Sequence, residues 1–108
     1  MRDGLYRLRF QGPRGWGAGI LFVTGENVRG GDGGFYYFGS VARDGDKVEI
    51  RVETRRHSQS TGLETIFGLD EVHVTLTGSL AGERILCDGS VAEMPGAQFL
   101  AELSWLSE

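Results

Sequence analysis

Apolar and polar side chains alternate, residue by residue, along much of this chain. Over residues 48–54, Val48, Ile50 and Val52 occupy every second position, and charged residues stand between them. The same period of two recurs over residues 72–77. Because successive side chains of a strand point to opposite faces of a sheet, this period predicts strands with one face buried in a core.

Glycine makes up 18 of the 108 residues, more than twice its usual share of about 7%. Two prolines and no repeating triplet exclude a collagen-like chain, and 40% hydrophobic residues argue against disorder. Glycines spaced between short apolar runs are instead typical of an all-β protein with many tight turns. Gly25 and the Asp44-Gly45 pair are predicted hairpin turns, and Asp-Gly suits the type I′ turn.

The pattern predicts about eight short strands in a single domain that spans residues 1–108. No segment offers the helical crossover that parallel strands require, so we expect an antiparallel meander. Eight such strands can close into a small up-and-down β-barrel without exposed edges, and a β-sandwich is the alternative. Ser60 or Thr61 can cap one short helical turn, which is the most helix that we expect. A barrel of this size is either filled by side chains or holds one small ligand.

The charge balance and the single cysteine narrow the class of protein. A net charge of −4 and a basic cluster interleaved with glutamates, over residues 49–57, argue against direct binding of nucleic acid. Cys87 has no partner for an internal disulfide, and the first ten residues lack the apolar run of a signal peptide. No run approaches the ~20 apolar residues that span a bilayer. We therefore expect a cytoplasmic protein that binds no membrane.

The cluster Gly30-Gly31-Asp32-Gly33-Gly34 raises the question of phosphate binding. A P-loop needs a following Lys-Ser or Lys-Thr pair and then a helix, whereas this cluster leads into Phe35-Tyr36-Tyr37-Phe38, which favours a strand. The sequence GWGAG at residues 15–19 also leads into a strand, so it is no dinucleotide fingerprint. We interpret these glycines as positions where the backbone turns or bends.

Enzymatic and metal chemistry have little support in the sequence. His57 and His73 have no Cys, His or Glu at zinc-ligand spacing, and no nucleophile motif such as Gly-x-Ser-x-Gly occurs. Cys87 falls on the apolar face of its strand, where a buried small side chain is its usual role. We expect no enzyme activity, no metal and no cofactor.

The aromatic residues are assigned to two faces. One set is expected in the core, or around a cavity that would take a small apolar ligand: Trp16, Phe22, Phe35, Tyr37, Phe99 and Trp105. A second set falls on the opposite faces of the same strands and is expected to form a homodimer interface: Tyr36, Phe38, Leu21 and Val23.

Motifs in the first half of the chain resemble the GrlR family, negative regulators of type III secretion gene expression. The similarity runs from Asp3-Gly4-Leu5-Tyr6 through Gly30-Gly31-Asp32 to about Val52. It implies a lipocalin-like β-barrel that dimerises and binds a transcriptional activator through an acidic surface loop. The family's Glu-Asp-Glu-Asp run corresponds here to Arg43-Asp44-Gly45-Asp46, in which two carboxylates remain and Arg43 and Gly45 depart from the pattern.

Two functional hypotheses follow. The first is a non-enzymatic regulatory barrel that binds itself and another protein, such as a transcriptional activator. The alternative is a carrier or sensor of a small apolar molecule that is held inside the barrel.

Overall fold

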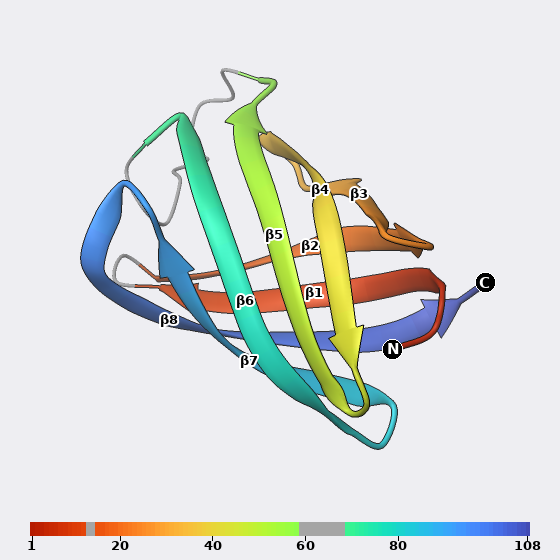
Figure 1. Ribbon diagram of the computed structural model, residues 1–108. Coiled ribbons are helices and arrows are strands. Elements are labelled where there is room, and N and C mark those ends of the chain that lie inside the picture. The colour runs from red at the N-terminus through yellow and green to blue at the C-terminus, as the bar shows by residue number, and fades with distance from the viewer. Residues whose placement is uncertain (13–14, 59–68) are drawn as a thin grey trace.

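Eight strands, joined in sequence order, close into a barrel in the computed structural model (Figure 1). The structure describes residues 1–12, 15–58 and 69–108, so the helical turn expected near Ser60 and Thr61 lies outside the described residues. The strands are β1 (Gly4–Gly12), β2 (Gly15–Thr24), β3 (Asn27–Gly31), β4 (Phe35–Asp44), β5 (Lys47–Arg56), β6 (Glu71–Ala81), β7 (Arg84–Val91) and β8 (Met94–Ser107). Each pairs antiparallel with the next, and β8 pairs back onto β1. The predicted up-and-down barrel is confirmed.

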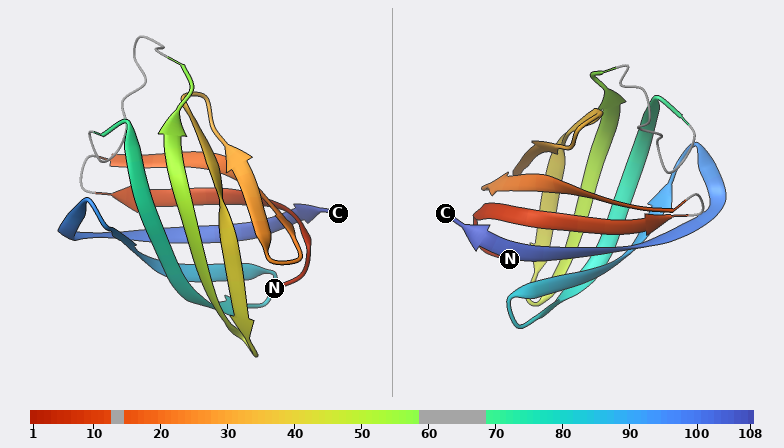
Figure 2. Two further views of the ribbon diagram at one scale, coloured as in Figure 1. Left: turned by 45° about the horizontal axis from the view of Figure 1, so that its top comes forward. Right: turned by 180° about the vertical axis from the view of Figure 1, so that it is seen from behind.

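The barrel is flattened rather than circular. Strands β4, β5 and β6 cross steeply over β1, β2 and β8, as Figure 1 and both views of Figure 2 show. The two termini lie close together at one end, where β1 begins and β8 finishes (Figure 2). Inward side chains of the two layers therefore meet in the middle and form one core.

Three of the hairpins share the same turn chemistry. Gly25, Gly45 and Gly82 each take the first place of a two-residue turn, with φ of 61°, 61° and 69°. Positive φ at the first turn residue alone is the type II′ pattern, and glycine adopts it at no steric cost. The prediction of a type I′ turn at Asp44-Gly45 is therefore wrong by one residue, since Asp44 still pairs with Lys47 and the turn is Gly45-Asp46.

The core is apolar throughout: among the described residues, no polar or charged residue is buried. The inward faces predicted for β5 and β6 are buried, with Ile50 and Val74 among their residues, and Tyr6 of β1 and Ile85 of β7 join the same core. Removing these aliphatic surfaces from water is the main force that holds the sheet closed.

Strand β2 has the opposite facing from the one predicted. Leu21 and Val23, expected on the outer surface, are 1% and 0% exposed, whereas Phe22, expected inside, is 43% exposed. The inward positions that precede Leu21 are Gly17 and Gly19. Side chains from other strands fill the space that these glycines leave, so the small residues, and not the large ones, mark the inner face of this half of β2.

Aromatic rings of other residues occupy the space above the inward glycines. A Cβ added to Gly17 would lie 2.7 Å from the Phe10 ring, and one added to Gly19 would lie 2.8 Å from the Tyr37 hydroxyl. On the far side, a Cβ on Gly89 would lie 2.2 Å from the Phe99 ring. The inward glycines are therefore required for the packing of these aromatic rings.

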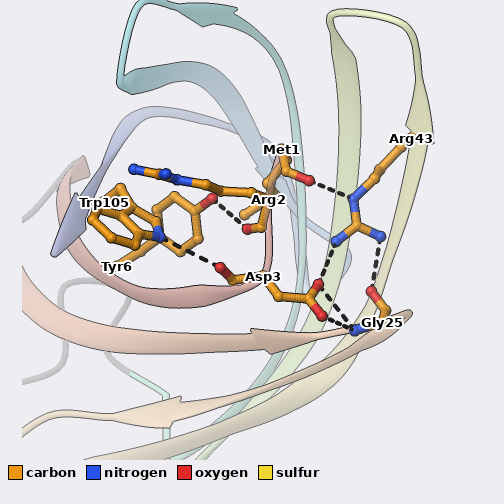
Figure 3. A network of polar contacts seen from close by, with 7 residues as sticks. All are labelled: Met1, Arg2, Asp3, Tyr6, Gly25, Arg43 and Trp105. Carbon is orange, nitrogen blue, oxygen red and sulfur yellow. Dashed lines mark hydrogen bonds and ion pairs between the residues drawn. The ribbon is translucent and has the colours of Figure 1, made fainter. Parts of the chain in front are cut away.

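The residues before β1 are fastened to the barrel by one arginine (Figure 3). Arg43 donates through Nε to the Met1 carbonyl (2.8 Å), through Nη1 to the Gly25 carbonyl (2.8 Å) and through Nη2 to Asp3 Oδ1 (3.2 Å). Both carboxylate oxygens of Asp3 in turn accept the Gly25 N–H, at 3.1 and 3.2 Å. We call Met1, Asp3, Gly25 and Arg43 the N-terminal clasp.

Aromatic residues complete this end of the barrel. The Arg2 guanidinium lies 3.5 Å from the centroid of the Trp105 ring, and Trp105 Nε1 donates to the Asp3 carbonyl at 3.4 Å (Figure 3). The Tyr6 hydroxyl donates to the Arg2 carbonyl at 2.6 Å, and burial raises the pKa of that phenol. The end of the barrel at which the termini meet is therefore covered by polar and aromatic contacts.

Phe22→Lys and Leu21→Lys test the facing of β2. Leu21→Lys places an unpaired charge in the core and should lower the free energy of unfolding by more than about 3 kcal/mol, or prevent folding. Phe22→Lys, one residue away, should cost less than about 1 kcal/mol because the side chain reaches water. Thermal unfolding followed by circular dichroism measures both, and the reverse order of stability would contradict the structure.

Arg43→Ala tests the N-terminal clasp. It removes three donors at a partly exposed site, so we expect the free energy of unfolding to fall by about 1 kcal/mol. Urea unfolding should show a lower midpoint with an unchanged slope. The adjacent exposed Asp44→Ala is the control and should change stability by less than about 0.5 kcal/mol. Equal stability of the two variants would show that the clasp contributes nothing.

Candidate ligand-binding cavity

The barrel contains a cavity of about 250 Å³ at the end opposite the N-terminal clasp. Its walls come from most strands of the barrel. The lining residues are Leu8, Phe10, Trp16, Gly17, Ala18, Leu21, Asp32, Gly33, Gly34, Phe35, Tyr37, Ile50, Val52, Thr54, Val74, Leu76, Phe99 and Ala101. Aliphatic and aromatic side chains predominate, as in sites that bind small molecules.

The cavity exists because small residues occupy inward positions at this end. Gly17 and Ala101 line it, and each pairs with Phe10 across the sheet. Toward the other end, the inward side chains become large and fully buried, as at Leu21, Ile85 and Leu103. A layer of fully buried side chains therefore closes this cavity toward the other end of the barrel.

The short third strand gives the cavity its mouth. β3 pairs with β2 over residues 20–24, and the described part of β2 before Ile20 pairs with β1 alone. The cavity reaches the surface between this segment and residues 32–34, where its lining residues Trp16, Ala18 and Gly33 are exposed.

The glycine cluster forms a turn at this mouth, as the sequence predicted, and its aspartate holds the turn together. Asp32 Oδ1 accepts the N–H groups of Gly34 (2.9 Å) and Phe35 (2.8 Å), and the Asp32 N–H donates to the Phe35 carbonyl (2.9 Å). His57, which directly follows β5, supports the turn. Its ring Nε2 lies 3.0 Å from the Asp32 carbonyl, and its backbone N–H donates to the Gly34 carbonyl at 2.9 Å. These bonds fix the position of the Asp32 carboxylate.

The second oxygen of that carboxylate accepts a hydrogen bond from the Tyr37 hydroxyl inside the cavity. Burial raises the pKa of Tyr37 well above its ordinary value, and the hydrogen bond to Asp32 and the negative charge of Asp32 raise it further. The phenol therefore stays protonated, and its proton is directed at Asp32. Asp32 and Tyr37 form what we call the acidic pole of the cavity.

The structure divides the residues predicted to line a cavity. Trp16, Phe35, Tyr37 and Phe99 line it. Phe22 points outward, for the reason given for β2. Trp105 lies at the other end of the barrel, beside a shallower hollow of about 330 Å³ that Met1, Arg2 and Glu83 also line.

Sequence reasoning missed the polar part of the cavity. The sequence pattern predicts only a turn at Asp32, and it places Thr54 on the apolar face of its strand without indicating a cavity. The alternation of β5 does place Thr54 inward, after Val52, so that signal was available. The contact between Asp32 and Tyr37 joins the turn to the inward face of β4, and alternation within β4 alone gives no sign of it.

The residues predicted as protein contacts fall on the outside, with one correction. Tyr36 is 41% exposed and Phe38 half-buried, and their rings stack at 6.0 Å between centroids. Leu21 and Val23 are core residues and take no part in any surface; the outward residues of β2 are Ile20 and Phe22. Strand β3 lies between β2 and β4. Ile20 of β2 and Tyr36 of β4 both pair with Gly31 of β3, and Phe22 and Phe38 both pair with Arg29. We call Ile20, Phe22, Tyr36 and Phe38 the outer aromatic patch.

The predicted partner-binding loop is the β4–β5 turn. Asp44, Gly45 and Asp46 are exposed there. Arg43 is part of the N-terminal clasp, so its guanidinium is already occupied within the chain. The turn therefore presents two carboxylates to solvent.

Other ionisable groups have structural partners. His73, on the outer face of β6, contacts Glu93 through Nδ1 and Glu53 through Nε2 (3.3 Å), and these carboxylates raise its pKa.

Within the described ranges, no group of three or more His, Cys, Asp or Glu residues is placed to hold a metal ion. Cys87 is buried, and burial raises the pKa of its thiol to about 11.

The fold and the cavity define a class: a closed eight-stranded antiparallel barrel with an apolar interior site that is open at one end. In comparisons with known proteins, neither a family model nor a curated protein sequence matched this chain. The similarity to the GrlR family therefore stays a prediction from the motifs. Among the described residues, no helix has the length and apolar character needed to cross a bilayer.

Proposed function

We propose that this protein is a non-enzymatic binding protein that holds a small, mostly apolar molecule inside its barrel. The observation that supports this most directly is the cavity of about 250 Å³, enclosed by aliphatic and aromatic side chains and open at one mouth. A preformed apolar site binds without first being ordered, which lowers the entropic cost of binding.

The volume limits the size of the ligand. At about 30 Å³ for each water-sized unit, about 250 Å³ accommodates roughly eight to ten non-hydrogen atoms. This corresponds to a medium-length aliphatic chain or a small fused ring. Larger drug-sized ligands usually occupy sites of about 300–1,000 Å³.

Ala101→Leu tests the cavity by filling it. The added atoms project into the space beside Phe10 and Phe99, so binding of 1-octanol should weaken at least tenfold, as measured by titration calorimetry. Stability should change by less than about 1.5 kcal/mol because the side chain enters an open space. Ala42→Leu, the same change at an exposed position of β4, is the matched control and should leave binding unchanged.

The same comparison of wild type and Ala101→Leu can reveal the natural ligand. Native mass spectrometry of protein purified from cells should show a small bound mass in the wild type and not in Ala101→Leu. Wild-type protein that binds neither 1-octanol nor any cellular molecule, or an Ala101→Leu variant that binds as well as the wild type, would contradict the proposed function.

A second candidate function, regulation through protein contacts, is favoured by the outer aromatic patch. Phe22 and Tyr36 are each more than 40% exposed, and such neighbouring apolar side chains on a monomer mark interaction surfaces. The surrounding charges have both signs, with Arg29 and Arg55 beside Glu53. A surface with both signs can be complementary to itself, so we propose that a second copy of the chain covers it.

The similarity to the GrlR family supports the same candidate, with dimerisation and negative regulation of type III secretion genes in the cytoplasm. In this proposal, Asp44 and Asp46 would contact a basic surface of a transcriptional activator. Arg43 would take no part, because the N-terminal clasp occupies it.

The double variant Tyr36→Lys/Phe38→Lys should be monomeric with an unchanged fold, because like charges would face each other across the dimer. Size-exclusion chromatography with light scattering gives the mass, and circular dichroism gives the fold. Leu86→Lys/Leu100→Lys, at two exposed leucines of β7 and β8, is the matched control and should remain dimeric. A dimeric Tyr36/Phe38 variant, or a monomeric wild type, would contradict this candidate.

A further inference from the structure

We infer that the cavity selects, among small apolar molecules, those with a protonated amine or another hydrogen-bond donor at one end, and that it rejects carboxylates. This inference rests on the proposed ligand-binding function and concerns the same cavity. It follows from the charge and the hydrogen-bonding capacity of Asp32 and Tyr37, the bonded polar pair that lines the site.

The acidic pole offers acceptors to a ligand. Asp32 Oδ1 already accepts two backbone N–H groups, and Oδ2 accepts the Tyr37 hydroxyl. The only proton that Tyr37 can donate is directed at Asp32, so the phenol oxygen faces a ligand as an acceptor. The remaining capacity of both groups is the acceptance of hydrogen bonds, in a place that also carries a negative charge.

No lining residue in the described part of the chain offers a compensating positive charge. Among the described residues, the lining contains Asp32 and neither Lys, Arg nor His. Two arginines lie near lining aromatics: the Arg56 guanidinium is 4.8 Å from the centroid of Phe35, and the Arg9 guanidinium is 5.9 Å from that of Trp16. Arg56 Nε also donates to Asp70 Oδ1 at 2.7 Å, so that charge is partly neutralised.

The ligand chemistry follows from this arrangement. A carboxylate at the acidic pole would meet a like charge and two groups without a free donor, and its desolvation would be uncompensated. An ammonium group would donate hydrogen bonds to Asp32, and such charge-assisted bonds are stronger than neutral ones. An alcohol can donate a single neutral hydrogen bond, so it should bind with intermediate affinity. Because the pole lies at the mouth, the apolar chain would extend toward Leu21 and Ile50.

Three ligands of equal chain length test this order: octylamine, 1-octanol and octanoate. At pH 7 the amine is protonated and the acid is ionised, since their pKa values are close to those of about 10.4 for Lys and about 4.3 for Glu. Titration calorimetry on the full chain at constant ionic strength should show octylamine binding at least tenfold more tightly than octanoate. Equal affinities, or tighter binding of octanoate, would overturn the inference.

Asp32→Asn identifies the group responsible. Asparagine keeps the side-chain carbonyl that accepts the N–H groups of Gly34 and Phe35, so the turn should persist while the negative charge is lost. The amine-to-carboxylate ratio should fall to within about threefold, and 1-octanol binding should change by less than about threefold. An unchanged ratio in Asp32→Asn would overturn the inference.

Tyr37→Phe is the second variant, and it keeps the charge of Asp32 while it removes the phenol. The preference for octylamine should persist, and its loss with Asp32 intact would overturn the inference. If 1-octanol binds but the three ligands do not differ, the proposed function stands and the inference fails. If none of the three binds, the inference fails, and the proposed function fails with it when native mass spectrometry finds no bound cellular molecule either.

Discussion

The distribution of side-chain volume on the inner face of the sheet determines the rest of this structure. In a closed barrel, every second residue points inward, so the interior is full only where those residues are large. Along β2 the inward series changes from Gly17 and Gly19 to Leu21 and Val23. The change from glycine to aliphatic side chains separates the cavity from the end of the barrel that carries the N-terminal clasp. The candidate site lies at the glycine end of this series.

Much of the fold could be predicted because several strands have one polar face. In β5 and β6, charged or hydroxyl side chains alternate with valine, leucine and isoleucine, and only one facing buries the apolar set. In β2 both faces are apolar or small, so hydrophobicity does not choose between them. The choice depends on Phe10 and Tyr37, whose atoms occupy the space above Gly17 and Gly19. Contacts with other strands decide that facing, and the sequence pattern of β2 alone does not contain them.

The site was predictable to a similar extent. Aromatic residues at inward positions of β4 and β8 suggested a cavity, and Phe35, Tyr37 and Phe99 do line one. The acidic pole was not predicted, because the glycine cluster was interpreted as a turn without chemistry. Asp32 does stabilise that turn through Oδ1, but its other oxygen is free to bond Tyr37. A turn residue can therefore also define the polarity of a binding site.

The two candidate functions meet on a single strand. Tyr37 points into the cavity and is bonded to Asp32, whereas its neighbours Tyr36 and Phe38 point outward and stack on each other. Alternation along β4 places Tyr37 on the inner face of the sheet and its two neighbours on the outer face. By linkage, a partner on the outer aromatic patch would change ligand affinity by the same factor as the ligand changes partner affinity.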